Sequence, residues 1–169
     1  FWSALTMATT LALPMLFYIE DNGWGISVPG RFQTPGGDVA ANLARFAGLR
    51  VLSGDGADPA EASALIDDAV SGVRESRAPA LLRLVVPRLE GHSFQDTQAY
   101  KSEEQIAAEC PRDPLPKLKK QCTRVQIGEE AWEGLEREAA WQVQAAVAEA
   151  EARGVSSPDE VTTNVFYEG

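Results

Sequence analysis

A chain of 169 residues, 44% of them hydrophobic, is long enough to bury a sizeable core and suits one domain with at most an appendage. Its formal net charge of −10 and its pI near 4.6 argue against a nucleic-acid-binding protein, because neutralising phosphates requires clustered lysine and arginine. The sequence has no run of about 18 apolar residues that would predict a membrane span. We therefore expect no nucleic acid and no membrane among its partners.

Two features bear on the cellular compartment. Cys110 and Cys122 are the only cysteines, and their spacing fits neither a zinc site nor a redox pair. We expect both to be buried and reduced, as in a reducing compartment, and therefore expect a cytoplasmic protein. The first fifteen residues are apolar but have no basic segment and no small-residue cleavage site, so they do not resemble a signal peptide. Their apolar spacing is that of a helix whose start lies upstream, which leads us to expect part of a longer chain.

Helix and strand patterns alternate along the first half of the sequence. Apolar residues at three- and four-residue spacing indicate helices, and short continuous apolar runs indicate strands covered on both faces, as in a parallel sheet. Pro14 should end the first helix, and Asp58 and Pro59 make a good start for the third. The order predicts an α/β fold, part of a doubly wound parallel sheet with right-handed crossovers. The predicted helices are 1–13, 38–46 and 58–76, and the predicted strands are 15–19, 49–52 and 80–86.

Beyond Lys101 the strand patterns stop and helical ones continue. We predict two short helices at 102–109 and 115–124, and a long one at 129–153 whose seven glutamates form a solvated face. An apolar stripe on the long helix predicts a packing face made of Trp132, Leu135, Ala139, Val143, Ala146 and Ala150. The expected parts are an α/β portion at 1–101, a helical extension at 102–153 and an irregular tail or linker at 154–169.

Unusual polar residues follow each of the three predicted strands. In an open parallel sheet, ligands bind beyond the carboxyl ends of the strands, so loops that leave those ends should converge on one site. The sequence therefore predicts a binding site at this edge of the sheet. The residues concerned are Asp21, Asn22 and the glycines after them, then Gly54, Asp55 and Gly56, and finally Arg88, His92, Ser93 and Asp96.

The glycines after the first strand nearly match a dinucleotide-binding fingerprint. Gly23 and Gly25 are in place, but Val28 stands where the third small residue belongs, and Pro29 follows without a helix. A nicotinamide-dependent oxidoreductase is therefore not predicted. Asn22 leaves two interpretations open: its side-chain oxygen is a hard ligand suited to Mg²⁺, or Asn-Gly simply forms a turn after a strand.

The other two loops also allow an ordinary reading. Residues 54–56, Gly-Asp-Gly, could contribute a metal ligand, but they end a strand and lead into a helix cap, which favours turn chemistry. His92 is the only histidine, and it could be a solvated loop residue or could meet an anion. Ser93 lies in no G-x-S-x-G elbow and has no second histidine to activate it, so a hydrolase is not predicted.

Several segments together resemble the alpha part of thiamine-diphosphate-dependent 2-oxoacid dehydrogenase E1 components. The resemblance implies a thiamine-diphosphate-binding fold, with residues 1–101 as the C-terminal portion of the diphosphate-binding α/β domain. It also implies oxidative decarboxylation of a 2-keto acid with acyl transfer to a lipoyl group. The segments that carry it, in this order, are FWSALTMATTLALPMLFYIEDNGWGISVP, VLSGDGADP, RLEGHSFQDTQAYKSEEQI and RDPLPKL.

The resemblance assigns roles to particular residues. It implies that Asn22 gives a side-chain ligand, and Trp24 its main-chain carbonyl, to Mg²⁺. His92 matches the histidine of the family's G-H-S loop and would act in catalysis by reaching the diphosphate of the cofactor. The residues implied to lie along the diphosphate are Asn22, Gly23, Trp24, Gly25, Ile26 and Ser27.

The sequence departs from the family pattern in two places. Asp21 stands where the family has the first of two asparagines, a position that does not bind the metal. The family's opening Gly-Asp-Gly, which supplies an aspartate ligand to magnesium, would come before Phe1. The triplet at 54–56 follows Asn22 and is therefore in the wrong order.

The implied partners are an E1 beta subunit or beta domain, the lipoyl domain of an E2 acyltransferase and a 2-keto acid. This portion alone is expected to be inactive. An alternative from another class is a non-catalytic α/β interaction or scaffold domain, in which Asn22 and His92 are ordinary loop residues. We also expect the loop 88–100 to be mobile without cofactor, because its composition offers little apolar burial to hold it.

Overall fold

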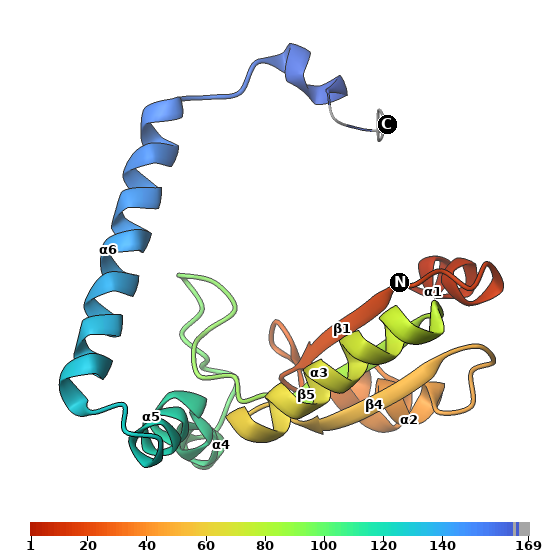
Figure 1. Cartoon of the computed structure of the whole chain (residues 1–169), viewed down its shortest axis with the longest axis horizontal. Coiled ribbons are helices and arrows are strands. Elements are labelled where there is room, and N and C mark those ends of the chain that lie inside the picture. The colour runs from red at the N-terminus through yellow and green to blue at the C-terminus, as the bar shows by residue number, and fades with distance from the viewer. Residues whose placement is uncertain (164, 166–169) are drawn as a thin grey trace. The chain divides into compact units, whose positions relative to one another are not determined.

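The computed structural model describes residues 1–163 and 165 (Figure 1). The chain forms two compact units that divide between Lys120 and Gln121. No helix in the described ranges is both long enough and apolar enough to cross a membrane.

The first unit is built on a three-stranded parallel sheet. Its strands are β1 (Leu16–Asp21), β4 (Arg50–Asp55) and β5 (Ala80–Val85), in the order β1-β5-β4. Asp21 and Asp55 both pair with Val85, so the three strands end together at one edge. The observed strands confirm the predicted α/β fold, and the flush register brings the loops that leave the three carboxyl ends to the same place.

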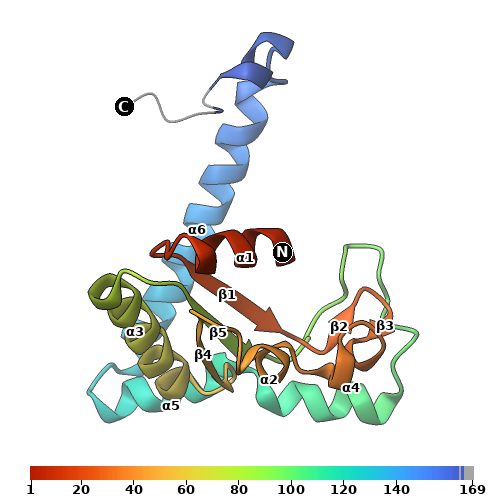
Figure 2. The same ribbon diagram turned by 90° about the vertical axis from the view of Figure 1, so that its right-hand side faces the viewer.

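Helices cover both faces of this sheet, as expected for a doubly wound arrangement. Leu5 of α1 (Trp2–Thr10) and Leu43 of α2 (Val39–Leu43) pack with Leu81 of β5 in one buried cluster. Ala69 of α3 (Pro59–Ser76) packs with the alternate β5 residues Leu82 and Leu84 on the opposite face. Figure 2 shows α2 and α3 on opposite sides of the strands. The continuous apolar run of β5 follows from this burial on both faces.

The first helix ends earlier than predicted, at Thr10 rather than at residue 13. Ala12 adopts a left-handed conformation with φ of 49°, and the main-chain N–H of Leu13 donates to the carbonyl of Ala8 at 2.9 Å. These two features form a Schellman-type C-cap, in which a left-handed residue stops the helix. Pro14 therefore follows the helix end and does not cause it.

Aspartates cap the next two helices. Asp38 accepts a hydrogen bond from Ala41 at the start of α2, and Asp58 accepts from Ala60 and Glu61 at the start of α3. The Asp58 cap was predicted. The second helix is shorter than predicted, because it starts after its cap at Val39 and ends at Leu43 instead of residue 46.

The remainder of the first unit is a small hairpin, one further helix and the first part of another. The hairpin pairs β2 (Trp24–Gly25) with β3 (Val28–Pro29), and short 3₁₀ turns at Gly30–Phe32 and Pro35–Gly37 follow. The predicted helix at 102–109 is α4 (Glu103–Glu109), with Ser102 and Gln105 forming a capping box. A 3₁₀ turn at Cys110–Arg112 then leads to α5 (Pro114–Arg124), close to its predicted bounds.

The cysteines correct one expectation and agree with another. Both thiols are free, in agreement with the expected reduced state. Cys110 is exposed and Cys122 is intermediate, so the expectation that both are buried was wrong. Cys110 lies in the 3₁₀ turn at Cys110–Arg112, on the surface of the unit.

The second unit contains α6 (Glu129–Arg153), with the predicted bounds, and a 3₁₀ turn at Pro158–Thr162. Trp132 is buried, but Leu135 and Val143 are more than half exposed, so the predicted packing face is not formed in the described structure. Periodic apolar spacing gives a helix one apolar side, but it does not supply a partner for that side. The predicted tail falls partly outside the described residues, at 164 and 166–169.

Candidate functional site

The segment after β1 is shaped by two successive side-chain turns. Asp21 Oδ1 accepts a hydrogen bond from the N–H of Gly23 at 2.9 Å, and Asn22 Oδ1 accepts from the N–H of Trp24 at 3.0 Å. Gly23 has φ of 73°, which favours glycine, and its carbonyl accepts from Gly30 at 2.6 Å. Asn22 thus makes the turn that sequence reasoning left open as one of its two interpretations.

The tip of the hairpin carries an unusual backbone. Ile26 has φ of 57°, a conformation that is a clear outlier for a β-branched residue, and its side chain is more than half exposed. Its carbonyl accepts a short hydrogen bond from Arg88 Nη1. Arg88 therefore fixes the hairpin tip from the loop that leaves β5.

Asp96 organises that loop. Its carboxylate accepts from the main-chain N–H of His92 at 2.7 Å and of Gln98 at 2.9 Å, from Tyr100 Oη at 2.8 Å, and from Arg88 Nη2 at 2.9 Å. The hydrogen bonds from His92 and Gln98 in particular lower the pKa of Asp96 to about 2. We expected little apolar burial in the loop 88–100, and Leu89 and Phe94 are exposed in agreement with that premise. The polar network around Asp96, which was not predicted, holds the loop instead. Its mobility without cofactor stays a prediction.

A buried lysine joins the loop to the hairpin. The side chain of Lys101 is fully buried, and its Nζ donates to the carbonyl of Arg88 at 3.1 Å and to Glu109 Oε2 at 2.7 Å. The same Nζ lies 5.4 Å from the centre of the Trp24 ring, which in turn lies 5.3 Å from the ring of Tyr100. The loop and the hairpin therefore lie side by side and contact each other. Sequence reasoning missed Lys101, because no local pattern marks a lysine as buried.

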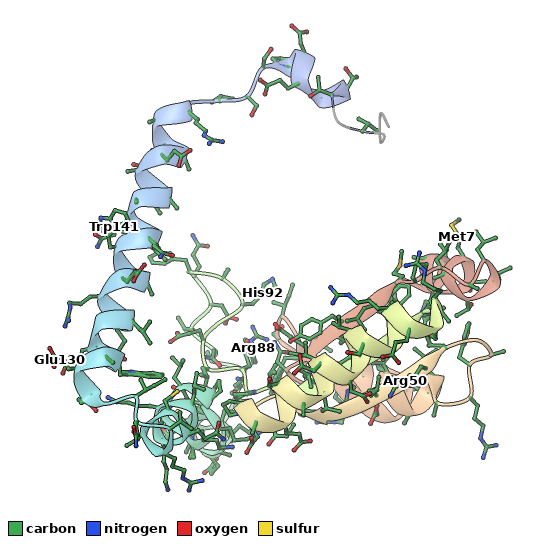
Figure 3. The ribbon with its side chains drawn as sticks, in the orientation of Figure 1. Met7, Arg50, Arg88, His92, Glu130 and Trp141 are labelled. Carbon is green, nitrogen blue, oxygen red and sulfur yellow. The ribbon has the colours of Figure 1, made fainter. Side chains whose placement is uncertain are left out.

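A cavity of about 270 Å³ opens beside the end of β1. Asp21, Asn22 and Trp24 line it, together with glycines of the two 3₁₀ turns. His92 lies on the neighbouring loop with an exposed side chain, while Arg88 is only 6% exposed at the base of that loop (Figure 3). The loops that leave β1 and β5 therefore lie side by side at one edge of the sheet, and Arg88 is committed to Ile26 and Asp96. The ligand roles of Asn22, Trp24 and His92 stay predictions.

The Gly-Asp-Gly triplet at 54–56 serves as a turn. Asp55 Oδ1 accepts from the N–H of Ala57 and from Arg112 Nη2, both at 2.9 Å. The hydrogen bond from Ala57 and the adjacent guanidinium of Arg112 hold the pKa of Asp55 below its usual value. Across the described ranges, no group of three histidine, cysteine, aspartate or glutamate side chains could hold a metal ion.

A parallel sheet covered by helices on both faces, with a polar hairpin and loop at its carboxyl edge, places the protein in the α/β class typical of thiamine-diphosphate-binding domains. The model of the dehydrogenase E1 component family matches residues 1–159, and the chain belongs to that family.

Relatives of known name are the alpha subunits of such enzymes. The chain is 30% identical over 127 residues to the pyruvate dehydrogenase E1 component subunit alpha of Porphyra purpurea, covering 75% of this chain and 37% of the relative. It is 28% identical over 166 residues to the same subunit of Zymomonas mobilis, covering 98% and 47%. It is 30% identical over 119 residues to the 3-methyl-2-oxobutanoate dehydrogenase subunit alpha of Mycobacterium tuberculosis, covering 69% and 32%. The chain thus spans less than half the length of these curated relatives.

Proposed function

We propose that this chain holds the magnesium-diphosphate end of thiamine diphosphate in a 2-oxoacid dehydrogenase E1 enzyme. The observation that carries the proposal is the meeting of the hairpin at Asn22–Ser27 and the loop of His92, joined by the hydrogen bond from Arg88 to Ile26 across 62 residues of sequence. Membership of the dehydrogenase E1 component family supports it. The reaction would be oxidative decarboxylation of a 2-keto acid, with transfer of the acyl group to a lipoyl group.

The residues present suit such a group. Magnesium prefers oxygen ligands, and the Asn22 side-chain oxygen and the Trp24 main-chain carbonyl are both of this kind. The Asn22 oxygen already accepts from Trp24, but a carbonyl oxygen has two lone pairs, so the turn and a metal bond are compatible. The turn also fixes the direction of that oxygen. Magnesium usually keeps several waters and binds substrate phosphates beside one or two protein ligands, so two protein oxygens from this chain would be a useful contribution to its shell.

The rest of the hairpin and the loop would hold the phosphates. Gly23 has open space where a side chain would stand, so a phosphate can approach its backbone closely. The Gln33 amide packs against Gly25 and donates to its carbonyl, and Ile26 and Ser27 continue the same segment. The exposed imidazole of His92 can donate a hydrogen bond to a phosphate oxygen, while its main-chain N–H is held by Asp96. When bound, thiamine diphosphate supplies the nucleophilic carbon that attacks the keto acid and stabilises the charge left by decarboxylation. The role of this chain would be to bind the cofactor and to orient it.

The proposal extends to partners. We expect an E1 beta subunit or beta domain to complete the cofactor site, and the lipoyl domain of an E2 acyltransferase to receive the acyl group, in the cytoplasm. This portion alone would be inactive. The names of the relatives include both pyruvate and 3-methyl-2-oxobutanoate dehydrogenases, so we propose a 2-keto acid as a class. A non-catalytic α/β scaffold domain is the alternative, and it would show no magnesium-dependent cofactor binding.

The test is cofactor binding by the complete enzyme carrying Asn22→Ala. We expect Asn22→Ala to weaken the binding free energy of thiamine diphosphate, measured by titration calorimetry with Mg²⁺, by about 2–3 kcal/mol, taking hydrogen bonds to charged groups as a guide. This corresponds to a rise of about 30- to 150-fold in the dissociation constant. Asn22→Asp is the matched control, because it keeps both an acceptor for Trp24 and an oxygen for the metal. For the loop, His92→Ala is compared with Gln95→Ala, a change at an exposed position of the same loop. An unchanged dissociation constant in Asn22→Ala would mean that Asn22 only forms a turn and is not a metal ligand.

A further inference from the structure

An arginine in the middle of the sheet is bound to the residue that precedes Asn22. Arg83 lies on β5, in register with Ile19 of β1 and Ser53 of β4, and its side chain is 13% exposed. Its Nε and Nη2 each lie 2.7 Å from Asp21 Oδ2. Its Nη1 lies 3.1 Å from Asp38 Oδ2 and 3.5 Å from the hydroxyl of Ser53. One cation therefore serves two carboxylates at the carboxyl edge of the sheet.

Both oxygens of Asp21 are occupied by the protein. Oδ2 binds Arg83, and Oδ1 accepts from the N–H of Gly23 at 2.9 Å. Asp21 also lines the 270 Å³ cavity, next to Asn22. A carboxylate at this place affects the binding of a phosphate and of a metal cation. Without a counterion it repels phosphate, and if it turns it competes with Asn22 as an oxygen ligand for a cation.

We propose that Arg83 is a positioning residue that keeps the Asp21 carboxylate bound and neutralised, so that the side chain of Asn22 and not that of Asp21 is presented to magnesium, and the diphosphate meets no unpaired negative charge. This inference rests on the proposed function. It explains how the site accommodates an aspartate where a neutral asparagine would bring no charge. The ionic contact with Arg83 compensates for the charge that Asp21 adds.

Asp38 provides the comparison that separates this role from a purely structural one. A buried arginine needs a counterion for the stability of the fold, and either carboxylate can serve. If Arg83 matters only in this way, the removal of either carboxylate should relieve the loss of Arg83 equally. If Arg83 acts on the binding site, only the removal of the Asp21 charge should restore binding. Asp38→Asn is a mild change, because asparagine caps a helix as well as aspartate does and α2 keeps its cap.

The experiment uses the complete enzyme and two probes, thiamine diphosphate with Mg²⁺ and inorganic pyrophosphate with Mg²⁺, both measured by titration calorimetry. The variants are Arg83→Gln, Arg83→Gln/Asp21→Asn and Arg83→Gln/Asp38→Asn, each checked for thermal stability without ligand. Arg50→Gln is the matched control, since it removes an arginine from the opposite end of β4 whose ion pair with Asp68 is about half exposed (Figure 3).

We expect Arg83→Gln to weaken the binding of both probes about tenfold or more, the effect of one uncompensated like charge several ångströms away at the effective dielectric of a protein surface. Arg83→Gln/Asp21→Asn should return to within about threefold of the wild-type constant, whereas Arg83→Gln/Asp38→Asn should stay weak. Arg50→Gln should bind as the wild type does. Equal constants for the two double variants would overturn the proposal, and so would unweakened binding in Arg83→Gln.

Three further outcomes are decisive. If Arg83→Gln does not fold, the two double variants, which carry the same net charge, are compared directly, and the tenfold difference between them is still expected. If Asn22→Ala weakens binding and Arg83→Gln does not, the inference about Arg83 fails while the proposed cofactor site stands. If neither probe binds to the wild-type enzyme, the proposed function itself fails.

Discussion

Lys101 offers the sharpest test of how the loop and the hairpin are held together. Its side chain is fully buried and binds Glu109 at 2.7 Å and the carbonyl of Arg88 at 3.1 Å. We consider the change Lys101→Met, which keeps most of the side-chain volume but removes the charge and the donors. Glu109 then loses its ion-pair partner, and the Arg88 carbonyl loses this donor in the interior.

The expected cost follows from these contacts. Removing one partner of a buried ion pair costs about 3–5 kcal/mol, and an unsatisfied buried carbonyl adds to the cost. Glu109 keeps 20% of its surface in contact with water, which recovers part of its solvation, and the methionine retains the packing of the lysine stem. We therefore expect Lys101→Met to lower the free energy of unfolding by about 2–3 kcal/mol.

Urea-induced unfolding followed by circular dichroism measures this difference. Lys120→Met is the control, because Lys120 is exposed and its loss should stay within about 0.5 kcal/mol. Lys101→Met/Glu109→Leu should recover much of the loss, since a buried pair can be replaced by apolar residues at little cost. If Lys101→Met costs no more than Lys120→Met, the lysine does not hold the loop and the reasoning is refuted.

Three further predictions concern the loop and the first helix. The pKa of Asp96 is lowered from 3.8 to about 2, so its contribution to the order of residues 88–100 is present above about pH 4 and is lost as the pH falls through 2. Hydrogen exchange corrected for intrinsic rates should show the protection of the loop falling in that window. A loss of protection already complete near neutral pH would contradict this prediction. Ala12→Gly should raise the free energy of unfolding in urea by about 0.5–1 kcal/mol, because glycine adopts the left-handed conformation at the end of α1 without strain. A destabilised variant would refute the assignment of Ala12 as the residue that caps this helix. Gly91→Ala should raise hydrogen exchange in the loop, because the new Cβ would lie 2.1 Å from the main-chain oxygen of Asp96. Gly128 has open space around it, so the control Gly128→Ala should leave the loop unchanged. An undisturbed loop in Gly91→Ala would contradict the contact.

Local chemistry made the elements of the sheet predictable. The apolar run of β5 (Ala80–Val85) is covered on both faces, and its observed end differs from the predicted one by one residue. The apolar runs also marked β1 and β4, which both extend into the polar residues that follow, to Asp21 and Asp55. The start of α3 was predictable, because Asp58 and Pro59 form a local signal. The end of α1 was not, because the left-handed residue that stops it is Ala12 and not a glycine.

The candidate site was predictable in position but not in its internal contacts. Parallel strands bring their carboxyl ends to one edge, which places the loops of Asn22 and His92 together. The partners of Arg83 lie 62 and 45 residues away, at Asp21 and Asp38, and no spacing rule connects them. Lys101 is buried only because α4 and the loop fold over it. Such contacts depend on tertiary structure, so a single sequence gives no signal for them.

The position of β1 in the sheet has a consequence for handling the protein. Within the described ranges β1 pairs with β5 on one side only, so its other side presents unpaired main-chain N–H and carbonyl groups next to the apolar residues 16–19. An uncovered strand of this composition is a template for pairing with another chain. Glu20 follows directly, and a charge at the end of such a segment opposes aggregation. A preparation of these residues alone should therefore associate more strongly as its concentration rises.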